Sequence, residues 1–211
     1  MSEESVLDDL EERETKGERT RRRLLELAIE QFGRKGLRAT SVTEITREAG
    51  LTQAASYAYF ENKAELFREA VNTDVVDLIA SATAPLADTP VRELLPSILV
   101  FLAAKLDEHP LAVRVLGGQE PEAMAQLRDL PALTDVRGLL ATRLRAAQET
   151  GEIRADVDVV KLAAGIQVVI LALLTTMTIG RGDAGDGADD TPPDVIAGIV
   201  EVFDALLRPP A

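Results

Sequence analysis

The sequence has no cysteine and a single histidine among its 211 residues. Without cysteine, the chain cannot form disulfide bonds, use a thiol nucleophile or hold a metal through thiolates. His109 stands before Pro110 at a predicted helix boundary, where we expect a capping or surface role. Because one histidine does not make a metal cluster, we expect no metal and no cofactor. No set of nucleophile, base and oxyanion donors stands out, so no residues in the sequence support an enzymatic function.

Aromatic residues are also scarce, at 3% of the chain. Most of them lie in the first third, which holds Phe32, Tyr57, Tyr59, Phe60 and Phe67, whereas Phe101 and Phe203 lie beyond it. No segment has a convincing strand pattern, and apolar residues recur at helical spacing along the whole chain. The sequence therefore predicts an all-α protein whose N-terminal part differs in composition from the rest.

Positive charge is confined to one segment of an acidic chain. The net charge is −13, yet residues 16–68 alone carry a net charge of +4. Residues 1–15 and 69–211 carry net charges of −6 and −11. Such an asymmetry allows one region to attract phosphates while the acidic remainder repels them and orients the protein. The same segment contains the motif described next.

Residues 41–60 predict two short helices separated by a tight turn. Ser41 and Glu44 have the spacing of a capping box at the start of the first helix. Gly50 stands where the helix must end, because glycine adopts left-handed backbone angles at little cost. Thr52 can cap the second helix, which we expect to run to about Tyr59. The pattern predicts a DNA-binding helix-turn-helix, and the alternative is an ordinary helical hairpin.

The surrounding pattern predicts three parts: an acidic flexible tail over 1–16, a DNA-binding domain over 17–63, and a larger helical domain over 64–211, to which the family resemblance described below assigns effector binding and dimerisation. The first helix should open at Gly17, bury Leu25, Ala28, Ile29 and Phe32, and end at Gly33 and Gly36. Asn62 and Glu65 should cap a helix over 63–83 that links the two domains. Further helices are expected at about 91–108, 111–116, 120–130 and 131–150, from Asp156 onwards, and from about 194 to 207.

The run from Leu162 to Gly180 contains no charged side chain. It is long enough to span a bilayer, so a membrane-anchored helical protein is one alternative. Gln167, three threonines and many small residues argue against that interpretation. A helix that is apolar on all sides is equally suited to burial in a protein core or in an oligomer interface.

The stretch AGLTQAASYAYFENKAELF goes beyond a generic helix-turn-helix, and it resembles the TetR family of bacterial transcriptional regulators. The matching features are Ala49-Gly50 at the turn, the Tyr57-Ala58-Tyr59-Phe60 run and Lys63, and the likeness covers about residues 18–68. The resemblance implies an all-helical, cytoplasmic homodimer that represses transcription by binding double-stranded DNA at a palindromic operator. It also implies that the last two long helices form the dimer interface.

The resemblance further implies a set of DNA-contacting residues. Thr43, Gln53 and Ala54 would meet base edges, Tyr57 would contact bases or backbone, and Ser41, Thr52, Tyr59 and Lys63 would contact phosphates. Glutamine suits adenine because it pairs one donor with one acceptor. For Tyr57 the alternative is partial burial, and the arginines from Arg19 to Arg23 form either a solvated face or further phosphate contacts.

An unidentified small-molecule effector is implied among the middle helices. The candidate lining is Phe101, Leu102, Leu116, Met124, Leu127, Ile170 and Met177, with Gln126 or Gln167 as polar groups. The alternative for each apolar residue is plain core packing. The scarcity of aromatics argues for an aliphatic pocket rather than one that stacks flat compounds. A helical enzyme with a vestigial DNA-binding module is the remaining alternative for the whole chain.

Overall fold

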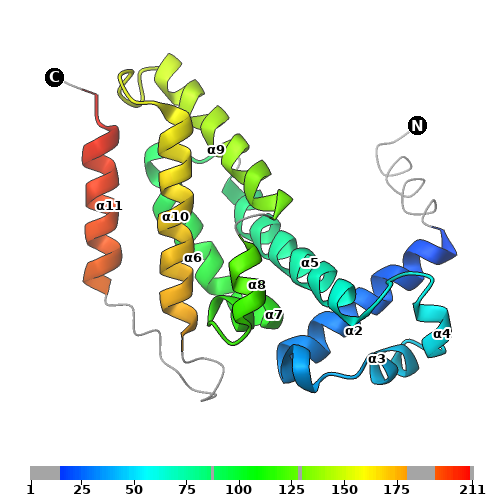
Figure 1. Ribbon diagram of the computed structural model, residues 1–211. Coiled ribbons are helices and arrows are strands. Elements are labelled where there is room, and N and C mark those ends of the chain that lie inside the picture. Colours follow the sequence, from blue (N-terminus) through cyan, green and yellow to red (C-terminus); the bar gives the residue numbers. More distant parts are fainter. Residues whose placement is uncertain (1–14, 87, 128–129, 180–192, 210–211) are drawn as a thin grey trace. The chain divides into compact units, whose positions relative to one another are not determined.

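The computed structural model describes residues 15–86, 88–127, 130–179 and 193–209. Helices account for the regular structure of these residues, and no strand occurs among them, which confirms the all-α prediction (Figure 1). The chain forms two compact units, one up to Ala70 and one from Val71 onwards. Most of the predicted acidic tail and the whole Gly/Asp-rich stretch from Arg181 to Asp190 lie outside the described residues.

Helix α2, Lys16–Ala39, opens the first unit with a complete capping box. The Thr15 hydroxyl accepts from the Glu18 backbone N–H, and the Glu18 carboxylate accepts from the Thr15 N–H at 2.7 Å. The prediction that Gly33 ends this helix is wrong, because the helix continues through it. Gly36, at φ 79°, breaks the helical geometry instead, as glycine readily can.

Helices α3, Val42–Glu48, and α4, Gln53–Ser56, form the helix-turn-helix with Gly50 at φ 73° between them. The predicted capping box at Ser41 is wrong. Ser41 makes no side-chain cap: the Glu44 N–H donates to the Ser41 carbonyl at 3.1 Å, and the Glu44 carboxylate accepts from Lys35 Nζ at 2.9 Å. The Thr52 cap is confirmed by its bond from the Ala55 N–H at 3.2 Å. The second helix is shorter than predicted and ends at Ser56, after which turns lead to the buried Phe60.

The core of the first unit joins α2 to the start of α5, Lys63–Thr83. The rings of Phe32 and Phe67 meet edge to face, with centroids 5.0 Å apart, a favoured geometry for aromatic pairs. Ile45 of α3 is also fully buried. Leu24 and Leu27 are buried on α2, whereas Ile29, predicted to be buried, is only half-buried. Asn62 caps α5 as predicted, accepting from the Glu65 N–H at 2.9 Å.

The second unit contains the rest of α5 and a series of shorter and longer helices. These are η1 Ala84–Leu86, α6 Val91–Lys105, η2 Leu106–Glu108, α7 Pro110–Leu116, α8 Pro121–Gln126, α9 Pro131–Glu149, α10 Val159–Thr178 and α11 Pro193–Leu207. Asp158, rather than the predicted Asp156, caps α10 through the N–H groups of Val160 and Lys161. Asp156 instead forms an ion pair with Arg154.

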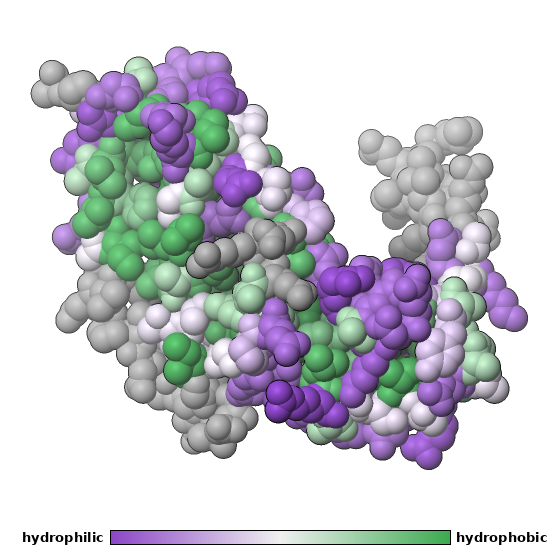
Figure 2. All heavy atoms as spheres, in the orientation of Figure 1, coloured by the Kyte–Doolittle hydropathy of each residue, from purple (hydrophilic) through white to green (hydrophobic). Residues whose placement is uncertain are grey.

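The core of the second unit lies between α6, α9, α10 and α11. Leu144 of α9 and Ala163 of α10 are fully buried in it, with Ile153 from the α9–α10 connection. The other sides of α10 and α11 stay apolar but exposed, and Figure 2 shows hydrophobic side chains gathered over these helices. Val168 on α10 is 66% exposed and Val202 on α11 is 57% exposed.

Gly50→Ala should destabilise the protein by about 1 kcal/mol, because a Cβ disfavours the left-handed region. No atom lies within 4 Å of the added Cβ, so the cost is conformational rather than steric. Gly138→Ala is the matched control, since Gly138 lies inside α9 with equally open space. It should be neutral or stabilise by about 0.5 kcal/mol. Equal effects of both changes in urea unfolding would contradict this account.

Candidate nucleic-acid interface and ligand cavity

The predicted DNA-contacting residues all reach the surface of the first unit. Thr43, Thr52, Gln53, Ala54 and Tyr57 are exposed, with Tyr57 at 54%. The remaining three, Ser41, Tyr59 and Lys63, are half-buried. Tyr57 is exposed enough to reach DNA, and the alternative for it, partial burial against the three-helix core, stays open.

Three of these side chains form one hydrogen-bonded chain. The Thr43 hydroxyl donates to Gln53 Oε1 at 3.0 Å, and Gln53 Nε2 donates to the Tyr57 hydroxyl oxygen at 3.3 Å. The chain orients the Gln53 amide before any ligand arrives. The second N–H and a lone pair of the amide remain free, which is the paired donor and acceptor that an adenine edge requires.

The backbone beneath this chain is fixed by buried polar residues. Ser56, which is buried, donates its hydroxyl proton to the Gln53 carbonyl at 2.8 Å. Thr46, also buried, donates to the Thr43 carbonyl at 3.2 Å. Each hydroxyl is satisfied locally, so its burial carries little penalty. These two hydrogen bonds therefore fix the backbone positions from which the two helices of the motif present Thr43 and Gln53.

The arginines at the start of α2 are largely engaged within the protein. Arg21 pairs with Glu69 at 2.9 Å and lies over the Phe60 ring at 5.1 Å, while Arg23 pairs with Glu26 at 3.2 Å. These contacts reduce the charge available to phosphate. Arg38 and Arg47, which the sequence interpretation left aside, are exposed and make no salt bridge within the described part of the chain. Because each of these arginines stands alone in the sequence and not in a run of basic residues, the sequence did not indicate that they could contact DNA.

Lys63 opens α5, and its Nζ donates to the Arg38 carbonyl at 3.3 Å. That single long hydrogen bond leaves two ammonium protons available. The side chain lies at a helix N-terminus, whose unpaired N–H groups also favour an anion. Lys63 therefore keeps part of its charge available for an anion at the N-terminus of α5.

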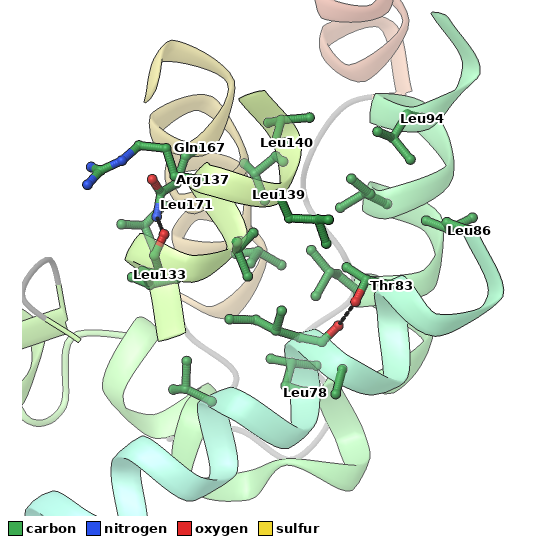
Figure 3. A pocket seen from close by; sticks show the side chains of 18 of the residues that line it. Leu78, Thr83, Leu86, Leu94, Leu133, Arg137, Leu139, Leu140, Gln167 and Leu171 are labelled. Atoms are coloured by element: carbon green, nitrogen blue, oxygen red, sulfur yellow. Dashed lines mark hydrogen bonds between the residues drawn. The ribbon is translucent and has the colours of Figure 1, made fainter. Parts of the chain in front are cut away.

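The second unit contains a cavity of about 700 Å³, lined mainly by aliphatic side chains of α5, α6, α9 and α10 (Figure 3). Five predicted effector residues line it, namely Leu102, Leu116, Leu127, Gln167 and Ile170. The other three, Phe101, Met124 and Met177, do not line this cavity. Phe101 packs against the core and Met177 is buried. The side chain of Gln126 lies outside the described part of the structure.

The sequence interpretation missed the two walls contributed by α5 and α9. Val75, Leu78 and Ile79 of α5 line the cavity, as do Leu133 and Arg137 of α9. The apolar stripe of α5 was visible in the sequence, but a stripe does not reveal whether it faces a core or a cavity. That distinction depends on how closely the neighbouring helices approach.

A buried ion pair joins α5 to the start of α7. Asp74 and His109 are 3% and 8% exposed, and Asp74 Oδ1 lies 2.9 Å from His109 Nδ1. The second carboxylate oxygen accepts from the Ala112 N–H at 2.7 Å. The predicted capping or surface role of His109 is wrong, since its side chain makes no cap bond and is buried. The pair satisfies both carboxylate oxygens and thereby holds α5 against α7.

The first unit is thus a helix-turn-helix DNA-binding module, and comparison with known proteins agrees. Residues 24–70 match the family model "Bacterial regulatory proteins, tetR family". The HTH-type transcriptional regulator YdgC of Bacillus subtilis (strain 168) is 30% identical over 157 residues, which cover 71% of this chain and 76% of the relative. The chain belongs to the TetR family and is a DNA-binding transcriptional regulator.

Two further relatives extend the likeness over most of the chain. The HTH-type transcriptional repressor SCO4008 of Streptomyces coelicolor (strain ATCC BAA-471 / A3(2) / M145) is 27% identical over 181 residues, covering 82% of this chain and 91% of the relative. The crystal structure of a TetR-family transcriptional regulator from Cytophaga hutchinsonii superposes with a TM-score of 0.61 at 20% identity, covering 92% and 95% of the two chains. The shared fold therefore includes the second unit.

The Asp74 carboxyl should make stability depend on pH. Burial raises the pKa of Asp74, which the bonds from Ala112 and His109 only partly offset. The preference of the folded state for the protonated Asp74 carboxyl therefore stabilises the protein fully below the ordinary pKa of about 4. This stabilisation is lost as the pH rises through the raised pKa. Relative to Asp74→Asn, the wild-type free energy of unfolding should fall as the pH rises from about 4 through the raised pKa, by about 1.4 kcal/mol per unit of pKa shift.

Urea unfolding followed by circular dichroism at several pH values measures this difference. Asp77→Asn is the control, because Asp77 lies on the same helix with an exposed side chain. It should leave the pH dependence as in the wild type. A stability difference between wild type and Asp74→Asn that is constant with pH would refute the account.

Proposed function

We propose that the protein is a ligand-responsive repressor that binds a palindromic operator as a homodimer. The observation that carries the proposal is the pre-oriented chain of Thr43, Gln53 and Tyr57 on the exposed face of the helix-turn-helix. The relative from Streptomyces coelicolor is named a repressor, which supports this sign of regulation. Its place of action would be the cytoplasm, and its role would not be enzymatic.

In this proposal residues 17–63 bind DNA and residues 64–211 bind the effector and the second protomer. Gln53 and Ala54 would meet base edges, while Ser41, Thr52, Tyr59 and Lys63 would contact the phosphates. Arg38 and Arg47 would add phosphate contacts. Because few of these groups are charged, shape and a small number of base contacts would determine the specificity.

The proposed dimer interface is the exposed apolar face of α10 and α11. By length and composition α10 could cross a membrane, and only 28% of its most apolar stretch is buried within the chain. Its remaining apolar surface therefore calls for another cover. A second protomer is the cover that we propose, because α11 presents apolar residues beside it and a two-fold dimer matches a palindromic site.

The effector would occupy the cavity of the second unit. Helix α5 lines that cavity and also contributes Lys63 and Phe67 to the first unit. A ligand that favours one position of α5 would therefore change the affinity for DNA, through its different affinity for two states of the dimer.

DNA binding is tested by footprinting the protein on the DNA upstream of its own gene and then comparing two variants on the protected site. Lys63→Ala should weaken binding to all sequences and reduce the slope of log affinity against log salt by about 1. Gln53→Ala should instead change the base preference, by about 1–3 kcal/mol at one position. The absence of a protected palindrome there and at neighbouring promoters would argue against the function, and equal effects of both variants against the residue roles.

The dimer interface is tested by Val168→Asp, with Val100→Asp as a matched control. Val100 is 67% exposed, almost the same as Val168, but belongs to α6, which the proposed interface does not include. Val168→Asp should weaken the dimer by roughly a hundred-fold or more, because an unpaired charge buried in an interface costs about 3 kcal/mol or more. Analytical ultracentrifugation measures both. Dissociation by Val100→Asp alone, or recovery of the wild type only in the membrane fraction, would overturn this assignment.

A further inference from the structure

The cavity of the second unit has few polar side chains in its wall, and most of them are already engaged. The four are Thr83, Arg137, Arg143 and Gln167. Thr83 donates to the Ile79 carbonyl, and Arg143 donates to the Leu86 and Thr89 carbonyls. Gln167 Nε2 donates to the Leu133 carbonyl at 2.9 Å, as Figure 3 shows. The Thr83 bond lies within α5, whereas the bonds of Arg143 and Gln167 join α9 to the segment around η1 and to α10 and hold these two side chains in place.

Arg137 is the exception. It makes no hydrogen bond or salt bridge within the part of the chain that the structure describes, and its side chain is half-buried. Arg137 is one of the lining residues, and Figure 3 shows its side chain running outward, with the guanidinium pointing away from the leucine side chains. A guanidinium always carries its charge and offers a planar fork of donors that fits a carboxylate or a phosphate.

The interior of the cavity favours an aliphatic body. No aromatic side chain is among its lining residues, so stacking contributes nothing to recognition. Leucines, valines and isoleucines from α5, α6, α9 and α10 form most of the wall. A volume of about 700 Å³ lies within the range of small-molecule sites.

We propose that the effector is an amphipathic aliphatic anion. Its hydrocarbon chain lies among the leucines, and its single anionic head, a carboxylate or a phosphate, binds the Arg137 guanidinium at the rim. An anion deeper in the cavity would lose its hydration, whereas at the rim it stays partly hydrated. This inference rests on the proposed ligand response and names the class of compound that drives it.

The proposal is tested with three ligands of equal chain length: dodecanoate, dodecyl phosphate and dodecanol, each below its aggregation concentration. Calorimetry on the purified full-length protein without DNA measures their affinities. At least one of the two anions should bind the wild type more than ten-fold tighter than the alcohol. The tighter of the two identifies the head group as carboxylate or phosphate.

Arg137→Gln should abolish the preference for the anion while leaving the affinity for dodecanol within two-fold of the wild type. The unchanged alcohol binding also shows that the variant is folded. Arg137→Lys keeps the charge and should retain part of the preference. Arg145→Gln is the matched control, because Arg145 lies exposed on the same helix and does not line the cavity. It should behave as the wild type.

Equal affinity of the wild type for the alcohol and both anions would overturn the proposal, as would an unchanged preference in Arg137→Gln. Failure of all three compounds to bind would overturn it as well. The operator affinity of the ligand-free protein is measured separately. Loss of that affinity alone would remove the proposed function while leaving the cavity assignment intact, so the two failures are distinguishable.

Discussion

Helix α5 contributes buried side chains to the interior of each of the two units, and the rest of the structure depends on these contacts. In the first unit Phe67 packs edge to face on Phe32 of α2, which supports the helix-turn-helix. In the second unit Asp74 accepts bonds from His109 and from the Ala112 N–H at the start of α7. The same helix then lines the cavity. One helix therefore takes part in DNA recognition, in core packing and in the proposed ligand site.

The recognition helix carries no charge, and its polar side chains are organised by one another. Gln53 is held between Thr43 and Tyr57, so its amide is oriented in the free protein and loses little freedom on binding. Most of the nearby arginine charge is engaged by glutamates. In the proposed mode of binding, electrostatic attraction to DNA is therefore modest, and sequence preference would depend on a few pre-oriented hydrogen bonds rather than on many arginine contacts.

The second unit shows two uses of aliphatic surface. On one side of α10 it builds the core and the cavity wall, where covering it stabilises the fold. On the other side it stays exposed, which is costly unless another surface covers it. Few polar side chains interrupt either apolar surface, so the positions of those few determine which polar groups of a ligand could be bound. Arg137 stands out for this reason.

The sequence by itself determined the features that depend on neighbouring residues. The turn at Gly50, the Thr52 and Asn62 caps and the bounds of α5 follow from contacts within about four residues, and all were predicted correctly. Only the tertiary structure decided the features that join distant residues. The Glu44 carboxylate binds Lys35 instead of forming the expected cap, and the buried His109 bonds Asp74, 35 positions away. Residues of α9, rather than Phe101 and Met177, line the cavity. Helical periodicity tells which face is apolar, but only packing decides what that face meets.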